Sequence, residues 1–263
     1  MRFGICTGPE NYAAAAEAGF DYVEGSLSDI AAMPEAEFQR LLALAPTLAA
    51  PLLKCNGFMP GTVKVTGPNA SPEEWRAYLE GALSRAHALG IETLVLGSGQ
   101  ARRVPDGFPH DQAWRQFADF LRLAGRFADK YDLDIVLEPL RRKECNIMNL
   151  VSEATLLSAL VDHPRINVLG DTYHLACTHE PLSSLTFAGS RLHHMHISHT
   201  LDDYDTRLFP KPGDGTDYAT LLRTLREMGY QGDVSVEAGY TDFAREAAAA
   251  AAYIKPLLED MRA

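Results

Sequence analysis

The chain has 263 residues, of which 46% are hydrophobic, so it can fill one large core or two smaller ones. Its formal net charge of −11 argues against a nucleic-acid or anionic-membrane partner, because neutralising phosphates requires clustered Lys and Arg. The 4 cysteines form no Cys-x-x-Cys pair, so neither a zinc ribbon nor a disulfide scaffold is indicated. Without a signal-like N-terminal segment or a long apolar run, a cytoplasmic location is the expectation.

Short apolar or β-branched runs alternate with helix-type segments along the whole chain. The runs span 2–8, 21–26, 52–58, 91–99, 133–140, 166–174, 192–199 and 233–239. Most end in Gly, Pro, Asp or Ser, as strands buried on both faces do. Since no linker-like stretch interrupts the alternation, we expect a single (β/α)8 TIM barrel over residues 1–263 rather than a doubly wound open sheet.

The helix after the third strand has the clearest boundaries. Ser71 is a good N-cap, Glu74 stands at the capping-box position and Gly90 ends the helical pattern. The sixth helix, around 181–189, has the weakest pattern. The Ala run 247–252 fits a closely packed outer helix, since Ala is the best helix former. Other helices are expected over 110–132, 150–161, 216–230 and 242–261.

Four acid or imidazole side chains close the last four predicted strands: Glu138, Asp171, His196 and Glu237. In a (β/α)8 barrel the carboxyl ends of the strands form one rim, where chemistry collects. Each residue alone has an ordinary explanation, such as a surface carboxylate, an N-cap or a structural His. Four such residues at the same end of four successive strands are not explained by coincidence. We therefore predict a divalent-metal site whose oxygen-rich ligands favour Mn²⁺, with Mg²⁺ or Co²⁺ as alternatives and Zn²⁺ less favoured.

The first four strands end in the residues Thr7, Glu24, Asn56 and Ser98, which are mostly neutral hydrogen-bonding groups. A rim with one charged half and one neutral half suits a polyhydroxylated ligand that lies on a metal. Asn56 and Ser98 are equally well explained as ordinary turn residues. Glu24 is more informative, because an acid that closes a buried strand requires a partner.

Three further features bear on the same rim. By strand alternation, His194 shares a face with His196 but lies deeper in the barrel. Phe58 and Met59 are expected to be exposed, so they would line the pocket or be covered by a second subunit, which leaves a homo-oligomer open. Asp214, in the segment KPGDG, would repel a phosphate, so an unphosphorylated substrate is preferred and this segment is expected to be a turn that starts the seventh helix.

The segments EPLRRKE, DTYH, HMHIS, PGDG and SVE resemble the xylose isomerase-like TIM-barrel superfamily, the sugar phosphate isomerase/epimerase group. Within it the pattern is most similar to ketose 3-epimerases of the tagatose/allulose type. The resemblance implies that the four residues closing the last strands are metal ligands, and that Glu138 and Glu237 are also the paired catalytic acid/base carboxylates. It further implies that Glu144 and His174 contact substrate hydroxyls.

One position departs from the epimerase pattern. In that family an Arg follows the metal-binding His by six residues and contacts substrate, whereas this chain has Asp202 there. Arg207, further along the same loop, is a candidate substitute, and Asn56 is a candidate substrate contact on the other half of the rim. The loop 201–215 therefore leaves the substrate, and even the exact reaction, open.

These residues predict a metal-dependent isomerase of carbohydrate metabolism, a ketose epimerase or aldose–ketose isomerase. It would act on an unphosphorylated ketose by removing a proton next to the carbonyl through a metal-stabilised enediolate. The alternative is a metal-dependent lyase or dehydratase on a keto-sugar, keto-inositol or 3-keto-glycoside, as other members of the resembled superfamily are. A DNA-repair enzyme of the endonuclease IV branch is disfavoured by the acidic charge, and a non-catalytic sugar-binding barrel is the remaining alternative.

Overall fold

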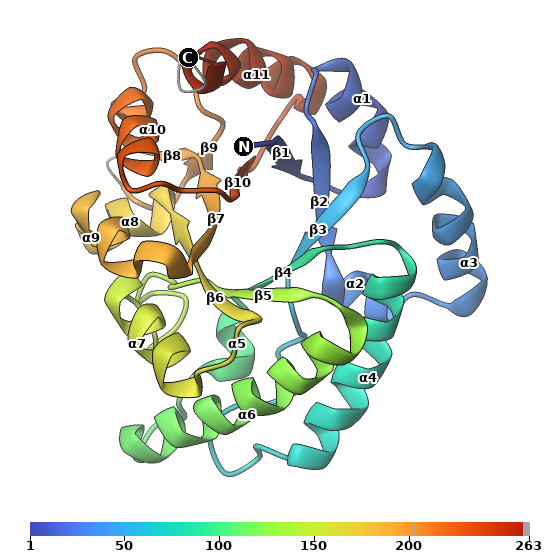
Figure 1. The fold of residues 1–263 in the computed structure, drawn as a ribbon, viewed down its shortest axis with the longest axis vertical. Helices are drawn as coiled ribbons and strands as arrows, with labels where there is room; N and C mark the ends of the chain where they lie inside the picture. The colour runs from blue at the N-terminus through green and yellow to red at the C-terminus, as the bar shows by residue number, and fades with distance from the viewer. Residues whose placement is uncertain (202, 260–263) are drawn as a thin grey trace.

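The computed structural model describes residues 1–201 and 203–259, and in this part of the chain eight parallel strands close into one barrel (Figure 1). Around the barrel the order is β1, β10, β7, β6, β5, β4, β3 and β2. The predicted fold class, a single-domain (β/α)8 TIM barrel, is confirmed. The strands are β1 (Phe3–Cys6), β2 (Tyr22–Ser26), β3 (Leu52–Asn56), β4 (Thr93–Leu96), β5 (Asp134–Leu137), β6 (Ile166–Asp171), β7 (Leu192–Ile197) and β10 (Asp233–Val236).

Helices surround the barrel and connect its strands (Figure 1). The helix after β3 is capped as predicted, because the Ser71 hydroxyl accepts a hydrogen bond from the Glu74 backbone N–H at 3.3 Å and Gly90 follows with a φ of +75°. The α-helices are α1 (Tyr12–Glu17), α2 (Leu27–Ala32), α3 (Glu35–Leu44), α4 (Pro72–Ala88), α5 (Gly99–Arg102), α6 (His110–Tyr131), α7 (Val151–Val161), α8 (Thr172–Thr178), α9 (Ser183–Ala188), α10 (Tyr218–Glu227) and α11 (Phe243–Glu259). The predicted sixth helix, around 181–189, is the short α9, and a further short helix, α8, begins within the run 166–174 that was expected to be strand.

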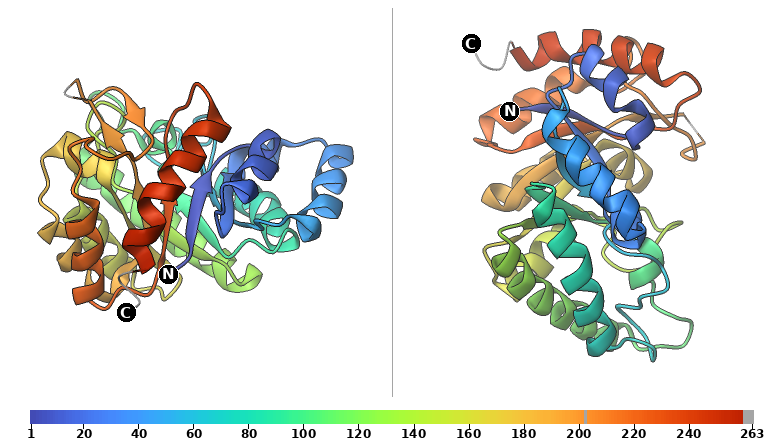
Figure 2. Two further views of the ribbon diagram at one scale, coloured as in Figure 1. Left: turned by 90° about the horizontal axis from the view of Figure 1, so that it is seen from above. Right: turned by 90° about the vertical axis from the view of Figure 1, so that its right-hand side faces the viewer.

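The last helix, α11, closes the ring of helices against α1 and the start of β1 (Figure 2). Its Ala247, Ala250 and Ala251 are buried, at the spacing of one helix face. Small side chains let this face approach its neighbours closely. The predicted tightly packed outer helix is therefore confirmed.

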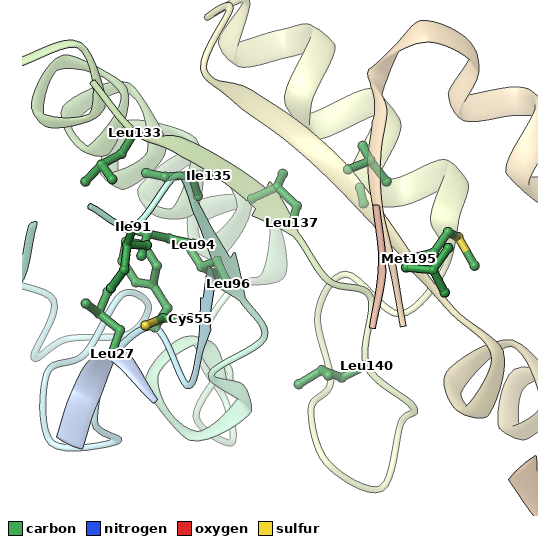
Figure 3. Packing of buried hydrophobic residues seen from close by; sticks show 14 of the residues in the cluster. Leu27, Cys55, Ile91, Leu94, Leu96, Leu133, Ile135, Leu137, Leu140 and Met195 are labelled. Carbon is green, nitrogen blue, oxygen red and sulfur yellow. The ribbon is translucent and has the colours of Figure 1, made fainter. Parts of the chain in front are cut away.

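Strand side chains alternate between the helices outside and the interior of the barrel. Leu96 and Leu137 belong to the large core that joins the strands to the helices (Figure 3). Their neighbours Val95 and Val136 instead form a small separate cluster with Leu169. β4, β5 and β6 thus fill their part of the barrel with branched apolar side chains.

The interior beside β2, β3 and β10 is polar. The ring of Tyr22 lies over Gly4, where an added Cβ would be 2.3 Å from the ring, so only glycine fits there. The Tyr22 hydroxyl is 2.8 Å from Ser235 Oγ. Below it, the buried Lys54 ammonium is 3.1 Å from a carboxylate oxygen of Asp233. Polar groups therefore continue from the base of the barrel toward its carboxyl-end rim.

A short antiparallel hairpin, β8 (His199–Thr200) with β9 (Arg207–Leu208), follows β7 on the carboxyl-end side of the barrel. Asp205, in its loop, is 3.0 Å from Arg141 Nη1 and 2.6 Å from Lys143 Nζ, both in the segment after β5. The hairpin therefore reaches from the side of β7 to the side of β5.

The expectation that Phe58 and Met59 are exposed is wrong. Phe58 is fully buried, with its ring edge-on to Phe120 of α6 at 6.3 Å, and Met59 is also buried. The segment after β3 folds back under α4, where the Tyr78 hydroxyl donates to the Phe58 carbonyl at 2.5 Å. These side chains are core residues, so they offer no surface to a pocket or to a second subunit.

Two further observations concern the cysteines and the helices. In residues 1–201 and 203–259 the cysteines are free thiols. Over the same residues, we find no helix that combines the length and apolar character needed to cross a bilayer.

Candidate metal centre

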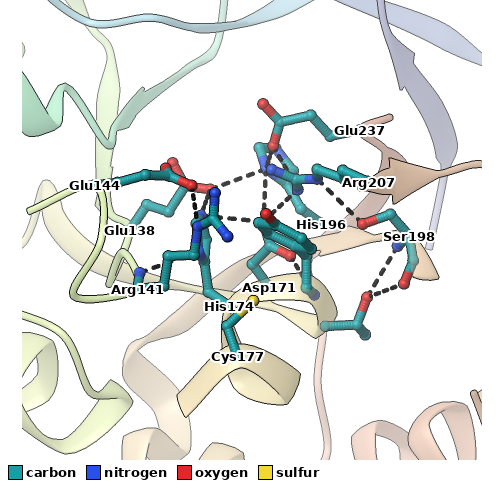
Figure 4. A network of polar contacts seen from close by, with 12 residues as sticks. Glu138, Arg141, Glu144, Asp171, His174, Cys177, His196, Ser198, Arg207 and Glu237 are labelled. Atoms are coloured by element: carbon teal, nitrogen blue, oxygen red, sulfur yellow. Dashed lines mark hydrogen bonds and ion pairs between the residues drawn. The ribbon is translucent and has the colours of Figure 1, made fainter. Parts of the chain in front are cut away.

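Four side chains from neighbouring strands meet at the carboxyl-end rim (Figure 4). Glu138 follows β5, Asp171 ends β6, His196 lies in β7 and Glu237 follows β10, and these strands are consecutive in the barrel. The pairing of β6 with β7 places Asp171 directly beside His196. One nitrogen or oxygen from each of the four lies within 4.8 Å of the others. The predicted convergence is present, and the role of these residues as ligands stays a prediction.

The imidazole Nδ1 of His196 is turned toward all three carboxylates. It lies 2.7 Å from Glu237 Oε2, 3.4 Å from Glu138 Oε1 and 3.9 Å from Asp171 Oδ2. Such a spacing of one imidazole nitrogen and three carboxylate oxygens provides the mixed donor set that Mn²⁺ or a similar divalent ion prefers.

The hydrogen bonding of three of these atoms indicates whether a cation fits between them. Glu138 Oε1, His196 Nδ1 and Glu237 Oε2 are buried and lack a hydrogen bond of good geometry in the described residues, although His196 Nδ1 and Arg207 Nη2 each approach Glu237 Oε2 to 2.7 Å. A buried polar atom without a hydrogen bond costs about 1–3 kcal/mol, so native structures rarely leave three together. A divalent cation would satisfy all three at once, and the residues present therefore fit a metal ion.

The two glutamates of this cluster differ in pKa. Burial and the neighbouring carboxylate of Glu237 raise the pKa of Glu138 to about 7. Burial also opposes ionisation of Glu237, but the guanidinium of Arg207 and the imidazole of His196 lower its pKa to about 2. Crowded acids with separated pKa values are typical of functional sites.

Arg207 reaches the cluster from strand β9. Its Nη2 is 2.7 Å from Glu237 Oε2 and also contacts Asp171 Oδ2, while its Nε donates to Ser198 Oγ at 3.1 Å. Burial lowers the pKa of Arg207, but the two acids more than offset this and raise it above its ordinary value. The sequence-predicted candidate therefore does lie at the site. Asp202, the position of the family Arg, lies outside the described residues.

The two predicted hydroxyl-contacting residues lie on the β5–β6 side of the cluster. His174, on α8, has its Nε2 3.9 Å from Glu138 Oε1 and 4.0 Å from Asp171 Oδ2, and its Nδ1 accepts from the Arg141 backbone N–H at 3.2 Å. Burial lowers the pKa of His174. Glu144 is paired with the Arg141 side chain at 2.6 Å, so the two form a charged group beside the cluster.

On the neutral half of the rim, the two turn-like residues behave differently. Asn56 Nδ2 donates to Glu237 Oε1 at 3.1 Å and so joins the cluster. Ser98 Oγ instead accepts from the Met59 backbone N–H at 3.0 Å and holds the segment after β3. The Asp214 segment forms a turn before α10, as predicted, with Asp214 accepting from the Lys211 and Thr216 backbone N–H groups.

Three contributions were missed by the sequence analysis. Arg141 was overlooked because it is one of several basic residues in EPLRRKE. Arg102 is fully buried beneath the rim, where it donates to the Glu138 carbonyl at 2.9 Å and the Gly97 carbonyl at 2.7 Å. Glu24 was expected to need a partner, but the identity of its partners, His194 and His196 at 3.0 Å each, was not predicted.

The closed (β/α)8 barrel with carboxylates and an imidazole on its carboxyl-end rim places this protein among the TIM-barrel proteins. The model of the family described as xylose isomerase-like TIM barrel matches residues 12–257, and the chain belongs to that family. The family resemblance seen in the sequence is confirmed.

Two curated proteins show moderate similarity. Fructoselysine 3-epimerase of Escherichia coli O157:H7 is 28% identical over 130 residues, which cover 49% of this chain and 47% of that protein. L-ribulose 3-epimerase of Methylomonas sp. (strain DH-1) is 28% identical over 158 residues, covering 59% of this chain and 51% of that protein. The chain thus spans about half the length of the curated relatives it matches.

The fold extends further than this sequence similarity. D-psicose 3-epimerase with D-tagatose from Clostridium cellulolyticum H10 superposes with a TM-score of 0.84 at 20% identity, covering 98% of this chain and 99% of that one. At this identity the match shows the shared fold.

Proposed function

We propose that this chain is a divalent-metal-dependent epimerase or isomerase of an unphosphorylated ketose. The observation that carries the proposal is that buried atoms of Glu138, His196 and Glu237, none with a well-formed hydrogen bond in the described residues, meet Asp171 at one point of the rim. The match to the xylose isomerase-like family, and the similarity of this chain to two sugar 3-epimerases, support the same class of reaction.

Glu138, Asp171, His196 and Glu237 would hold the cation, with Mn²⁺ the first choice and Mg²⁺ or Co²⁺ the alternatives. When bound, the ion supplies Lewis-acid polarisation of a carbonyl and stabilises the negative charge that develops when a neighbouring C–H loses its proton.

The protein side chains carry the proton. Glu138 and Glu237 come from strands that lie three positions apart around the barrel, and both point into the same space. One carboxylate removes the proton next to the carbonyl on one face of the sugar. The other side chain returns a proton on the opposite face, which inverts that carbon. Asn56 orients Glu237, because it donates to Oε1 and leaves Oε2 facing the centre.

The remaining rim residues would bind hydroxyls. His174 lies within 4 Å of Glu138 and Asp171, and Glu144 is held beside them by Arg141. Arg207 provides a cation near Asp171 and Glu237 that can donate to a sugar oxygen. Together they give positional selectivity among the hydroxyls.

The test is proton NMR of the protein with Mn²⁺ and a ketohexose such as D-tagatose in D₂O. We expect deuterium at the carbon next to the carbonyl together with an epimeric or isomeric product, and loss of both after exhaustive chelation. Release of a leaving group without an epimer would instead support the lyase or dehydratase. Binding of sugar with neither exchange nor product would indicate a non-catalytic sugar-binding barrel.

Substitution tests the paired carboxylates directly. Glu138→Gln and Glu237→Gln should each lower kcat by roughly 10³-fold, because an amide cannot accept the proton. Glu92→Gln is the matched control, since Glu92 pairs with Arg2 at 2.7 Å away from the rim and should leave kcat unchanged. Full activity in either rim variant contradicts the mechanism.

A further inference from the structure

The two ring nitrogens of His196 face opposite environments. Nδ1 is turned toward the candidate metal centre, 2.7 Å from Glu237 Oε2, and makes no hydrogen bond to a described residue. Nε2 points the other way, into the barrel, 3.0 Å from Glu24 Oε1. Cys6 Sγ lies 4.0 Å from the same nitrogen, so Glu24 provides its nearer contact.

Glu24 is fully buried and held from several strands. Its second oxygen, Oε2, accepts from Ser235 Oγ of β10 at 2.9 Å and lies 3.0 Å from His194 Nε2 of β7. The carboxylate therefore cannot rotate away from His196 without losing these contacts. Its position in the barrel is defined by the packing of β2, β7 and β10.

The chemistry of these contacts determines which nitrogen of His196 carries hydrogen. An ionised carboxylate only accepts hydrogen bonds, so a nitrogen at 3.0 Å from Glu24 Oε1 must be protonated to interact favourably. In a neutral imidazole the other nitrogen then has a free lone pair. That lone pair belongs to Nδ1, which is the atom directed at the three rim carboxylates.

We propose that Glu24 is a positioning residue for the metal centre: it keeps Nε2 of His196 protonated and so presents the Nδ1 lone pair to the cation. This inference rests on the metal centre of the proposed function. Carboxylates that orient a metal-binding imidazole from behind raise metal affinity about 10- to 100-fold in other sites.

A purely structural role for Glu24 makes a different prediction. Asp233 is a second buried carboxylate of the barrel interior, paired with Lys54 at 3.1 Å and Arg2 at 2.7 Å, and its side chain makes no contact with His196 in the described residues. If Glu24 only satisfied buried polar neighbours, loss of its charge and loss of the Asp233 charge would lower stability alike and leave metal binding alone.

The experiment compares Mn²⁺ binding to the wild type, Glu24→Gln and the control Asp233→Asn by the EPR signal of free Mn²⁺. We expect Glu24→Gln to bind Mn²⁺ about 10- to 100-fold more weakly. Asp233→Asn should bind within twofold of the wild type. The visible spectrum of bound Co²⁺ should change in Glu24→Gln and not in the control, because a neutral amide no longer favours the Nε2-protonated imidazole as strongly as the carboxylate does.

Each outcome decides the matter. Equal Mn²⁺ affinities and Co²⁺ spectra in the wild type and a folded Glu24→Gln overturn the positioning role but leave the metal centre standing. If the wild type binds no Mn²⁺, the metal centre and this inference both fail. Should Glu24→Gln not fold, Glu24→Asp replaces it, because the shorter acid keeps the charge but cannot reach Nε2 at the same distance; unchanged affinity there overturns the proposal.

Discussion

The guanidinium of Arg207 lies against two of the acids that form the candidate metal centre. Its Nη2 contacts Asp171 Oδ2 and Glu237 Oε2, which are the oxygens closest to His196 Nδ1 from those residues. A guanidinium and a metal ion are both cations, so they compete for the same oxygens.

Arg207→Met should therefore strengthen Mn²⁺ binding severalfold, because two carboxylate oxygens lose their internal counter-ion and are free to bind the metal. The KM for the proposed sugar substrate should rise at the same time, since Arg207 is the proposed donor to a substrate oxygen. Isothermal titration with Mn²⁺ and steady-state kinetics measure the two effects. Arg142→Met, an exposed neighbour of the rim, is the control. Weaker Mn²⁺ binding in Arg207→Met would show that the guanidinium supports the ion instead.

For single residues, the sequence predicts which side chains lie at the ends of strands but not which side chains meet across the barrel. Glu138 and His196 each close a recognisable β run, so their convergence follows from parallel strands sharing one rim. The contact of Glu24 with His194 depends on the tilt and register of β2 relative to β7, which no local pattern encodes. Arg102 was missed because a buried Arg satisfied by backbone carbonyls has the same sequence appearance as an exposed one.

The end of β4 is shaped to receive a side chain from β5. A Cβ on Gly97 would lie 2.3 Å from Glu138 Oε2, so the carboxylate occupies the space that any other residue would fill. Neighbouring strands thus set the orientation of the acid as much as its own backbone does.

Gly97→Ala should displace the Glu138 carboxylate and lower kcat and Mn²⁺ affinity together, each by an order of magnitude or more. The control is Gly81→Ala in α4, where an added Cβ meets no atom within 4 Å and should stabilise the helix by about 0.5–1 kcal/mol. Kinetics, Mn²⁺ titration and thermal unfolding of the two variants separate the effects. Wild-type kcat in Gly97→Ala would mean that Glu138 tolerates the shift.

Among the elements, strands and long helices are predictable, whereas short and folded-back segments are not. The capping residues of α4 and the apolar face of α6 are local signals. The hairpin of β8 and β9 has only two residues per strand, too few for an alternating pattern. Phe58 was expected at the surface because it follows a strand, but the segment after β3 folds under α4, and this contact is set by tertiary packing.

Across the whole molecule, charge is buried at both ends of the barrel. At the base, burial alone would raise the pKa of Asp233, but Arg2 and Lys54 lower it to about 2. A group whose pKa is lower in the folded state stabilises the fold above its unfolded value, near 4, and loses that contribution as the pH falls toward the folded value.

We therefore expect Asp233 to stabilise the protein fully at neutral pH and to have lost about 1 kcal/mol of that contribution by pH 3. Asp233→Asn should be less stable at pH 7 and should show a shallower fall in stability between pH 5 and pH 3. Urea unfolding at a series of pH values measures both curves. Parallel curves would mean that the Asp233 carboxylate has an ordinary pKa in the folded protein.

The hairpin that carries Arg207 limits the directions from which the proposed substrate could reach the rim. It is anchored to the β5 side through Asp205 and to the β7 side through Ser198, so it covers one flank of the rim. On the opposite flank a pocket of about 280 Å³ opens between the ends of β1, β2 and β3, and Asn56 on its wall touches Glu237. For the proposed sugar substrate this pocket would offer an approach to Glu237 beside Asn56, and bulky replacements of Thr7 or Ser26, which line it, would narrow that approach without altering the carboxylates of the proposed mechanism.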